Sequence, residues 1–232
     1  MGTRVAMKLT SLLKLPICVV AMGLVLAGCG NDTGSADMKK VFLSTLPDFS
    51  GKNKKAPPSV QTNVGTVLKS TPKPLALVEL GEHKSAAFVV EIERNGPYRT
   101  FATAQRQSIV MRQGVVTATR GLGNDLMSSS VSGSLNLITQ RRAGAAQRVM
   151  RYLDGENITR ELVFDCKVSV GGSEGYSAGE IHAQTRIVTE ACTSPVRSFT
   201  NRYLVSNAGM VLSSTQWLSP IGGSAQISIL RN

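Results

Sequence analysis

The chain has 232 residues, 42% of them hydrophobic, and carries 26 basic against 15 acidic side chains, a net charge of +11. With two histidines and four cysteines in all, the sequence offers few ligands for a tetrahedral metal centre. The positive charge indicates either an acidic partner, such as nucleic acid, anionic lipid or acidic polysaccharide, or simply a well-solvated surface.

The N-terminus has the pattern of an exported protein. Three basic residues within 1–14 precede thirteen mostly apolar residues, 15–27, which are too few to span a hydrocarbon layer of roughly 30 Å. The segment ends in Leu26-Ala27-Gly28-Cys29, which resembles the processing site of bacterial lipoproteins. We therefore predict cleavage after Gly28 and a diacylglyceryl group on Cys29. The alternative is an ordinary secretory signal that happens to contain a cysteine.

Lipidation would fix the location of the protein and narrow its partners. Several acyl chains on Cys29 give stable membrane attachment, whereas one chain binds only marginally. Gly30 stands where an aspartate would resemble an inner-membrane retention signal, so we expect the periplasmic face of the outer membrane. The mature chain keeps 23 basic and 15 acidic residues. Outside the cytoplasm this charge meets lipid headgroups, acidic polysaccharides and envelope proteins, and we predict no nucleic acid partner.

The four cysteines have different expected fates. Cys18 lies in the removed leader and Cys29 is the lipidation site, which leaves Cys166 and Cys192. In an oxidising periplasm we predict that this pair forms a disulfide. A metal site is the competing interpretation, but two cysteines without CxxC spacing and two histidines do not make a convincing ligand set. We predict no metal and no cofactor.

The sequence divides into four parts: a signal peptide (1–28), a tether (29–36), an N-terminal helix with a Pro/Lys-rich segment (37–74) and a β-domain (75–232). The tether is small and polar, as flexible linkers are. Asp37 can cap a short helix that runs to Leu46 and ends at Pro47. The proline- and lysine-rich residues 48–74 form either a disordered spacer or a loop that wraps the body, and we expect no strand in their first half.

After Pro74 the chain consists of short alternating runs separated by glycine and asparagine. This texture predicts an all-β domain, an antiparallel barrel or sandwich. The expected strands are 75–80, 86–94, 98–104, 108–112, 115–119, 135–139, 148–153, 162–170, 186–192, 199–205, 210–217 and 225–230. Turns are expected at Asn95-Gly96, at Gln113-Gly114 and at 207–209, and the glycine-rich residues 171–179 are expected to form a hairpin tip. The structure of 141–147 is left open between helix and strand.

Two motifs suggest chemistry, and both are weak. Gly175 to Gly179 matches the G-x-S-x-G pattern of serine hydrolases around Ser177. No aspartate follows Asp165, and we do not expect the later histidine, His182, to act as the base from a hairpin arm five residues away. The run Gly121 to Leu126 lacks the third glycine of a dinucleotide fingerprint and is better explained as a tight turn held by Asn124 and Asp125. We predict no catalytic residue.

Basic and aromatic residues give the remaining candidates. The densest basic stretch consists of five arginines, Arg141, Arg142, Arg148, Arg151 and Arg160. A contact between this stretch and an acidic polymer is our hypothesis. Aromatic residues make up only 5% of the chain, and we expect Trp217 and Tyr203, on neighbouring predicted strands, to pack in the core rather than to form a sugar platform.

Several local sequences together resemble one family. They are 108–128, Tyr152-Leu153-Asp154-Gly155, the pair Cys166 and Cys192, 199–203 and 214–220. They look like the YjbF/GfcB-type group 4 capsule polysaccharide lipoproteins, over about residues 40–230. The resemblance implies an all-β, barrel-like periplasmic domain on a lipid anchor that serves capsule or exopolysaccharide production and export. It supplies no catalytic residues.

These observations predict a non-enzymatic, lipid-anchored accessory protein that contacts either anionic polysaccharide or another protein of the export machinery. Two alternatives stay open. One is an envelope structural or assembly lipoprotein without glycan contact. The other is a periplasmic hydrolase that acts through Ser177.

Overall fold

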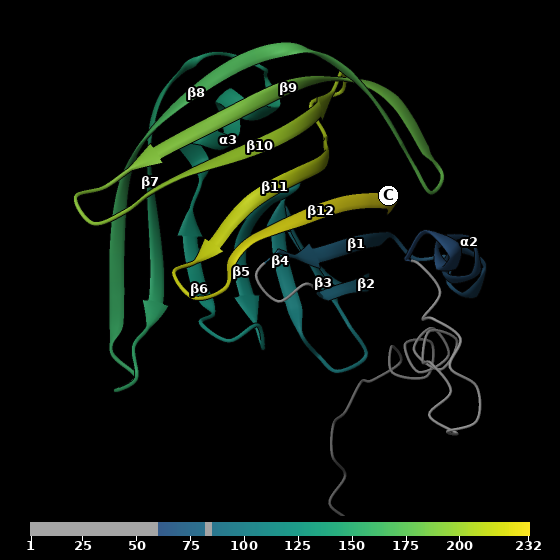
Figure 1. The fold of residues 1–232 in the computed structure, drawn as a ribbon, viewed down its shortest axis with the longest axis horizontal. Helices are drawn as coiled ribbons and strands as arrows, with labels where there is room; N and C mark the ends of the chain where they lie inside the picture. Colours follow the sequence, from purple (N-terminus) through teal and green to yellow (C-terminus); the bar gives the residue numbers. More distant parts are fainter. Residues whose placement is uncertain (1–59, 82–84) are drawn as a thin grey trace, which may run out of the picture. The chain divides into compact units, whose positions relative to one another are not determined.

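A computed structural model describes residues 60–81 and 85–232, which form twelve antiparallel strands and two short helices (Figure 1). The predicted signal peptide, Cys29, the tether and the expected helix over 37–46 lie outside the described residues. Within them, no helix has the length and apolar character needed to cross a bilayer. The all-β prediction is confirmed, and of the two architectures proposed the barrel is correct.

The strands form one sheet in the order β5-β4-β3-β2-β1-β12-β11-β10-β9-β8-β7-β6. The described part of the chain starts with helix α2 (Val60–Ser70) and ends with β12 beside β1. The strands are β1 (Leu75–Leu80), β2 (Ser85–Asn95), β3 (Tyr98–Ala102), β4 (Ser108–Arg112), β5 (Val115–Arg120), β6 (Leu126–Ser130), β7 (Gly144–Leu153), β8 (Thr159–Ala178), β9 (Ile181–Thr193), β10 (Ser198–Ser206), β11 (Val211–Ser219) and β12 (Gly223–Arg231). Helix α3 (Ser132–Thr139) lies between β6 and β7 in the sequence.

Side chains, rather than a strand ladder, join the two edge strands β5 and β6. Thr119 accepts a hydrogen bond from Leu126 N–H (2.9 Å) and donates one to the Asp125 carboxylate (3.0 Å). Arg120 donates to Leu126 O (3.2 Å). Asp125 also accepts bonds from Gly121 N–H and Leu122 N–H, so the predicted tight turn is present here. The seam satisfies edge groups that an open sheet would leave exposed.

The alternation of the sequence determines which side chains fill the barrel. On β7 the residues 148, 150 and 152 are buried, and on β8 the residues 164, 166 and 168 are buried, as the period of two requires. Aromatic rings fill one region: Phe199 stacks on Trp217 (4.7 Å between centroids), and Phe164 lies edge-on to both. The expected core positions of Trp217 and Tyr203 are thus confirmed.

The strand predicted at 135–139 is wrong, because this segment is helix α3. Leu135 and Ile138, three residues apart, are both buried and pack with Val168, Val188 and Val205. The helix packs against β7 to β10 and covers this part of the barrel interior. Tertiary packing therefore selects the helix for a short apolar run, Leu-Asn-Leu-Ile-Thr, that by itself does not distinguish strand from helix.

Other elements also differ from the prediction. Helix α2 was not expected within 48–74, although Val60, Val64, Val67 and Leu68 have helical spacing. Strand β6 was not predicted, and 141–147 resolves into a short connection followed by the start of β7.

The hairpin of β8 and β9 is longer than predicted. The glycine-rich residues 171–179 are mostly strand rather than loop, and the turn falls at Gly179 and Glu180. The tip packs against β12: Tyr176 donates a hydrogen bond to Ile229 O (2.7 Å), and Glu180 N–H donates to Leu230 O (2.8 Å). A Cβ on Gly179, whose φ is +58°, would lie 2.5 Å from Leu230 O, so this close approach needs glycine. The hairpin therefore arches over the outer face of β10 to β12 (Figure 1).

Candidate functional site

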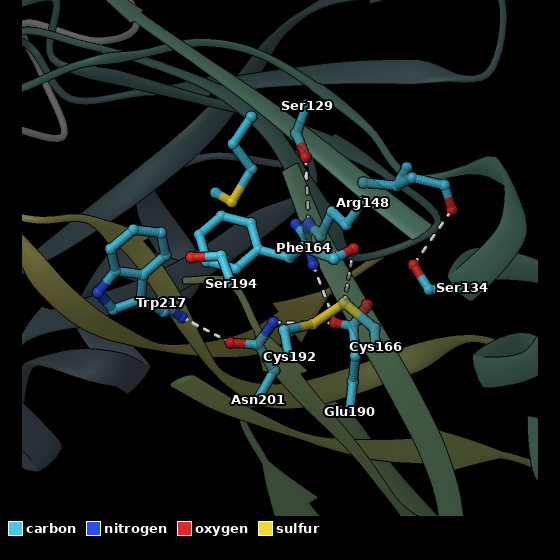
Figure 2. The surroundings of a disulfide bond; sticks show 12 residues. Ser129, Ser134, Arg148, Phe164, Cys166, Glu190, Cys192, Ser194, Asn201 and Trp217 are labelled. Carbon is cyan, nitrogen blue, oxygen red and sulfur yellow. Dashed lines mark hydrogen bonds and ion pairs between the residues drawn. A yellow bond between two sulfur atoms is a disulfide. The ribbon is translucent and has the colours of Figure 1, made fainter. Parts of the chain in front are cut away.

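A buried ion pair lies at the centre of the barrel, beside the disulfide (Figure 2). Arg148 on β7 donates through Nη1 to Glu190 Oε2 on β9 at 2.9 Å, and the two side chains are 1% and 0% exposed. The same carboxylate oxygen accepts bonds from Asn201 Nδ2 (2.9 Å) and the Tyr203 hydroxyl (2.7 Å). Because burial of charge is costly unless the charges are paired and hydrogen-bonded, this network is a structural feature of the core.

Side chains inside the barrel also form hydrogen bonds with the free edge of β5. Arg148 donates to Val116 O (3.1 Å) and to Ser129 Oγ on β6 (3.1 Å). Gln216 on β11 accepts from Val116 N–H (2.9 Å) and donates to Gly114 O (2.8 Å). Backbone groups along the edge of β5 that lack a strand partner therefore form hydrogen bonds with side chains of β7 and β11.

Both members of the ion pair stay charged. Burial alone would raise the pKa of Glu190, but the guanidinium of Arg148, with hydrogen bonds from Asn201 and Tyr203, holds that pKa below its ordinary value. Burial and the neighbouring carboxylate of Glu190 raise the pKa of Tyr203 well above its usual range, so its hydroxyl keeps the proton that it donates. Neither group is poised to exchange a proton near neutral pH.

The five arginines proposed to contact an acidic polymer do not form one surface, which corrects that hypothesis. Arg148 is buried inside the barrel. Arg151 pairs with Glu161 (2.7 Å) and Arg160 with Asp154 (2.7 Å). Arg141 donates to Ser206 O (2.8 Å) in the β10–β11 turn, and Arg142 is exposed beside it in the sequence. Period-two alternation explains the split, because Arg148 shares the inward face of β7 with Met150 and Tyr152.

A cleft opens at the end of the barrel where the β2–β3, β4–β5 and β10–β11 turns meet. Its volume is about 210 Å³. The lining residues are Arg94, Gly96, Pro97, Arg99, Phe101, Met111, Gln113, Gly114, Met210, Val211, Ile229 and Asn232. The close approach of the β4–β5 turn to β11 shapes one wall, since a Cβ on Gly114 (φ +86°) would lie 2.6 Å from Val211 Cβ. The cleft has an apolar floor with polar and cationic groups around it.

A β-bulge in β2 brings the charged side chains of this cleft onto the same face of the sheet. In a regular strand Glu91 and Arg94 would lie on opposite faces, but the register of β2 against β3 shifts at Ile92. As a result Arg94 pairs directly with Arg99, two residues before Phe101 on β3. Glu91 accepts hydrogen bonds from Arg94 Nε (2.9 Å) and Arg99 Nε (2.9 Å), so one carboxylate serves two guanidiniums.

The charges in this cleft persist at neutral pH. Burial alone would raise the pKa of Glu91, but the bonds from Arg94 and Arg99 outweigh it and hold that pKa below its ordinary value. The Arg99 guanidinium lies 5.0 Å from the centroid of the Phe101 ring and also donates to Asn232 Oδ1. The side chains of Glu91, Arg94 and Arg99 therefore carry one negative and two positive charges.

Ser177 and His182 are hydrogen-bonded, contrary to expectation. They face each other across β8 and β9, and Ser177 Oγ lies 2.9 Å from His182 Nδ1. Both side chains are exposed, and in the described part of the chain no carboxylate is bonded to His182. A nucleophile of this class needs an oriented base and an oxyanion hole at the end of a strand, and this pair lies on the outer surface of a hairpin arm.

The predicted disulfide is present. Cys166 and Cys192 are directly opposed on β8 and β9, with a sulfur–sulfur distance of 2.02 Å. Their sulfurs lie within 4.8 Å of a Glu190 oxygen, as three metal ligands might. Disulfide sulfurs are not thiolates, however, and Glu190 is already engaged by Arg148, so this group fits a covalent crosslink rather than a metal centre.

The barrel architecture is shared with a lipoprotein of known structure. The crystal structure of the hypothetical lipoprotein YmcC from Escherichia coli (K12) superposes with a TM-score of 0.64 at 18% identity, covering 75% of this chain and 90% of that one. A search of curated proteins gives no match. The sequence profile of the YjbF group, described as group 4 capsule polysaccharide lipoprotein gfcB, YjbF, matches residues 58–230. The chain belongs to this family, a capsule-associated lipoprotein family of the cell envelope.

Proposed function

We propose that this protein is a lipid-anchored accessory protein of capsule or exopolysaccharide production or export, held through Cys29 at the periplasmic face of the outer membrane. The match to the family over 58–230 is the observation that carries the proposal. The mature chain is strongly basic, which favours contact with acidic polymer. The proposed role is non-enzymatic, because within residues 60–81 and 85–232 no carboxylate is bonded to His182, the partner of Ser177 in the hydrolase-like motif.

Deletion of the gene is expected to lower the amount of polymer secreted, and a plasmid copy should restore it. A copy with Ser177→Ala should restore it equally well, because the exposed Ser177 hydroxyl is hydrogen-bonded to His182 on the surface of the hairpin. The measurement is the mass of secreted polymer per cell. If the Ser177→Ala copy fails while its protein level is normal, the hydrolase alternative replaces ours. Normal output after deletion would favour an envelope role without glycan contact.

The mature protein is expected to incorporate labelled palmitate, and Cys29→Ser should abolish the label. The acyl groups need the Cys29 thiol and the amino terminus released by cleavage after Gly28. The matched control is Cys18→Ser, which lies in the leader and should leave the label intact. Label that persists in the Cys29→Ser protein would refute the anchor.

A further inference from the structure

We propose that the cleft between the β2–β3, β4–β5 and β10–β11 turns binds one carboxylate-bearing sugar unit of an acidic polysaccharide, with Arg94 as the contact to the carboxylate. This inference rests on the proposed function and names the ligand class of that role.

The charge arrangement is the first step of the argument. Arg94 and Arg99 are directly opposed across β2 and β3, a placement that costs stability when both residues are cations. Glu91 neutralises one of the two charges, so these three side chains together retain one net positive charge. A second carboxylate brought by a ligand would complete the neutralisation.

Arg94 is the guanidinium that is available to a ligand. Its side chain is 59% exposed, against 20% for Arg99. It uses Nε and Nη2 to bind Glu91, so the remaining N–H groups of its five can donate to another acceptor. Arginine suits a carboxylate because its planar fork matches the two oxygens.

The shape and lining of the cleft fit a sugar ring. Pro97 and Met210, which are accessible to solvent, supply apolar atoms for the C–H face of the ring, and the exposed Gln113 supplies an amide for hydroxyls. At about 210 Å³ the cleft is smaller than the sites of drug-sized ligands, which occupy roughly 300–1,000 Å³. It therefore suits one unit of a longer chain.

A second cleft, of about 190 Å³, lies near the opposite end of β1 and does not fit the same ligand. Its lining includes Val78, Leu80, Val89, Ile109 and Leu122 and contains no charged side chain. Within the described residues, the Arg94 cleft is thus the one of these two with a cationic group, which an acidic unit requires.

Binding is tested with the mature protein in detergent micelles and two forms of one oligosaccharide. The first form contains glucuronate, and the second is the same oligosaccharide with each carboxylate reduced to an alcohol. We expect wild-type protein to bind the acidic form about tenfold more tightly, because only that form offers a carboxylate for charge-assisted hydrogen bonds from Arg94. Calorimetric titration measures both affinities.

Variants assign the binding to the cleft. Arg94→Glu should weaken binding of the acidic form by about tenfold or more, and Arg94→Gln should weaken it less, because it removes the cation without adding repulsion. Arg160→Glu is the matched control, since Arg160 is 61% exposed and also paired with a carboxylate, but lies in a different hairpin. Equal losses in Arg94→Glu and Arg160→Glu, or equal affinity for the two oligosaccharides, would overturn the inference.

Two further outcomes separate this inference from the proposed function. If wild-type protein binds neither oligosaccharide while gene deletion lowers polymer output, the ligand inference fails and the accessory role stands. If deletion has no effect but Arg94-dependent binding is measured, the role fails and the cleft stands as an acidic-sugar site. Arg94-dependent binding to vesicles of anionic lipid, without binding to the oligosaccharide, would assign the cleft to a membrane surface instead.

Discussion

Replacement of Glu190 by glutamine is expected to destabilise the protein by about 3 to 5 kcal/mol, since removal of one partner of a buried ion pair leaves the other charge uncompensated. Arg148 is 1% exposed and would have no carboxylate to face. Asn201 and Tyr203 would also lose the anionic oxygen to which both donate. The free energy of unfolding, measured by urea denaturation, checks this result.

The matched control is Glu161→Gln. Glu161 pairs with Arg151 at 2.7 Å on the surface, where the two side chains are 46% and 41% exposed. Water and salt screen such a pair, so its loss should cost less than about 1 kcal/mol. A similar, small loss in both variants would show that the interior of the barrel admits water to Arg148, contrary to the burial described.

Loss of the disulfide is expected to cost about 3 to 4 kcal/mol. Cys166 and Cys192 are 26 residues apart, and closing a loop of this length restricts the unfolded chain by about that amount in the chain-entropy treatment. The double substitution Cys166→Ala with Cys192→Ala removes the crosslink with a small change in buried volume. Urea denaturation of the oxidised wild type and the variant measures the difference.

Reduction by dithiothreitol supplies the control for this prediction. The reductant should lower the unfolding midpoint of the wild type toward that of the alanine variant, and it should leave the variant unchanged. If the free energy of unfolding of the variant is lower by less than about 1 kcal/mol, residual pairing of β8 and β9 already restricts the unfolded chain, and the crosslink adds little to that restriction.

Most strands could be predicted because they are short β-branched or alternating runs bounded by glycine and asparagine. The run from Leu162 to Val170 is the clearest case of alternation, and its inward residues include Phe164, Cys166 and Val168. The disulfide followed from counting cysteines in an exported chain. Helix α3 could not be found in this way, since a short apolar run such as 135–139 does not distinguish helix from strand, and the packing that selects the helix comes from distant strands.

The buried ion pair could have been predicted from the alternation of residues on β7 and β9. Arg148 shares its face with Met150 and Tyr152, and Glu190 shares its face with Val188 and Cys192, so a strict period of two places both charges inside. The hypothesis of a basic surface was wrong for Arg148 because it grouped arginines by their distance in the sequence and not by the face of the strand. The cleft had no such signal, because the bulge at Ile92 reverses the face that alternation assigns to Arg94.

The packing inside the barrel has a consequence for transport. Phe164, Tyr203, Arg148, Glu190 and Gln216 occupy the lumen and are at most 1% exposed. A polymer chain therefore has no passage along the barrel axis, because side chains fill the interior of the domain. A polymer that contacts this domain can therefore do so only at its outer walls and rims.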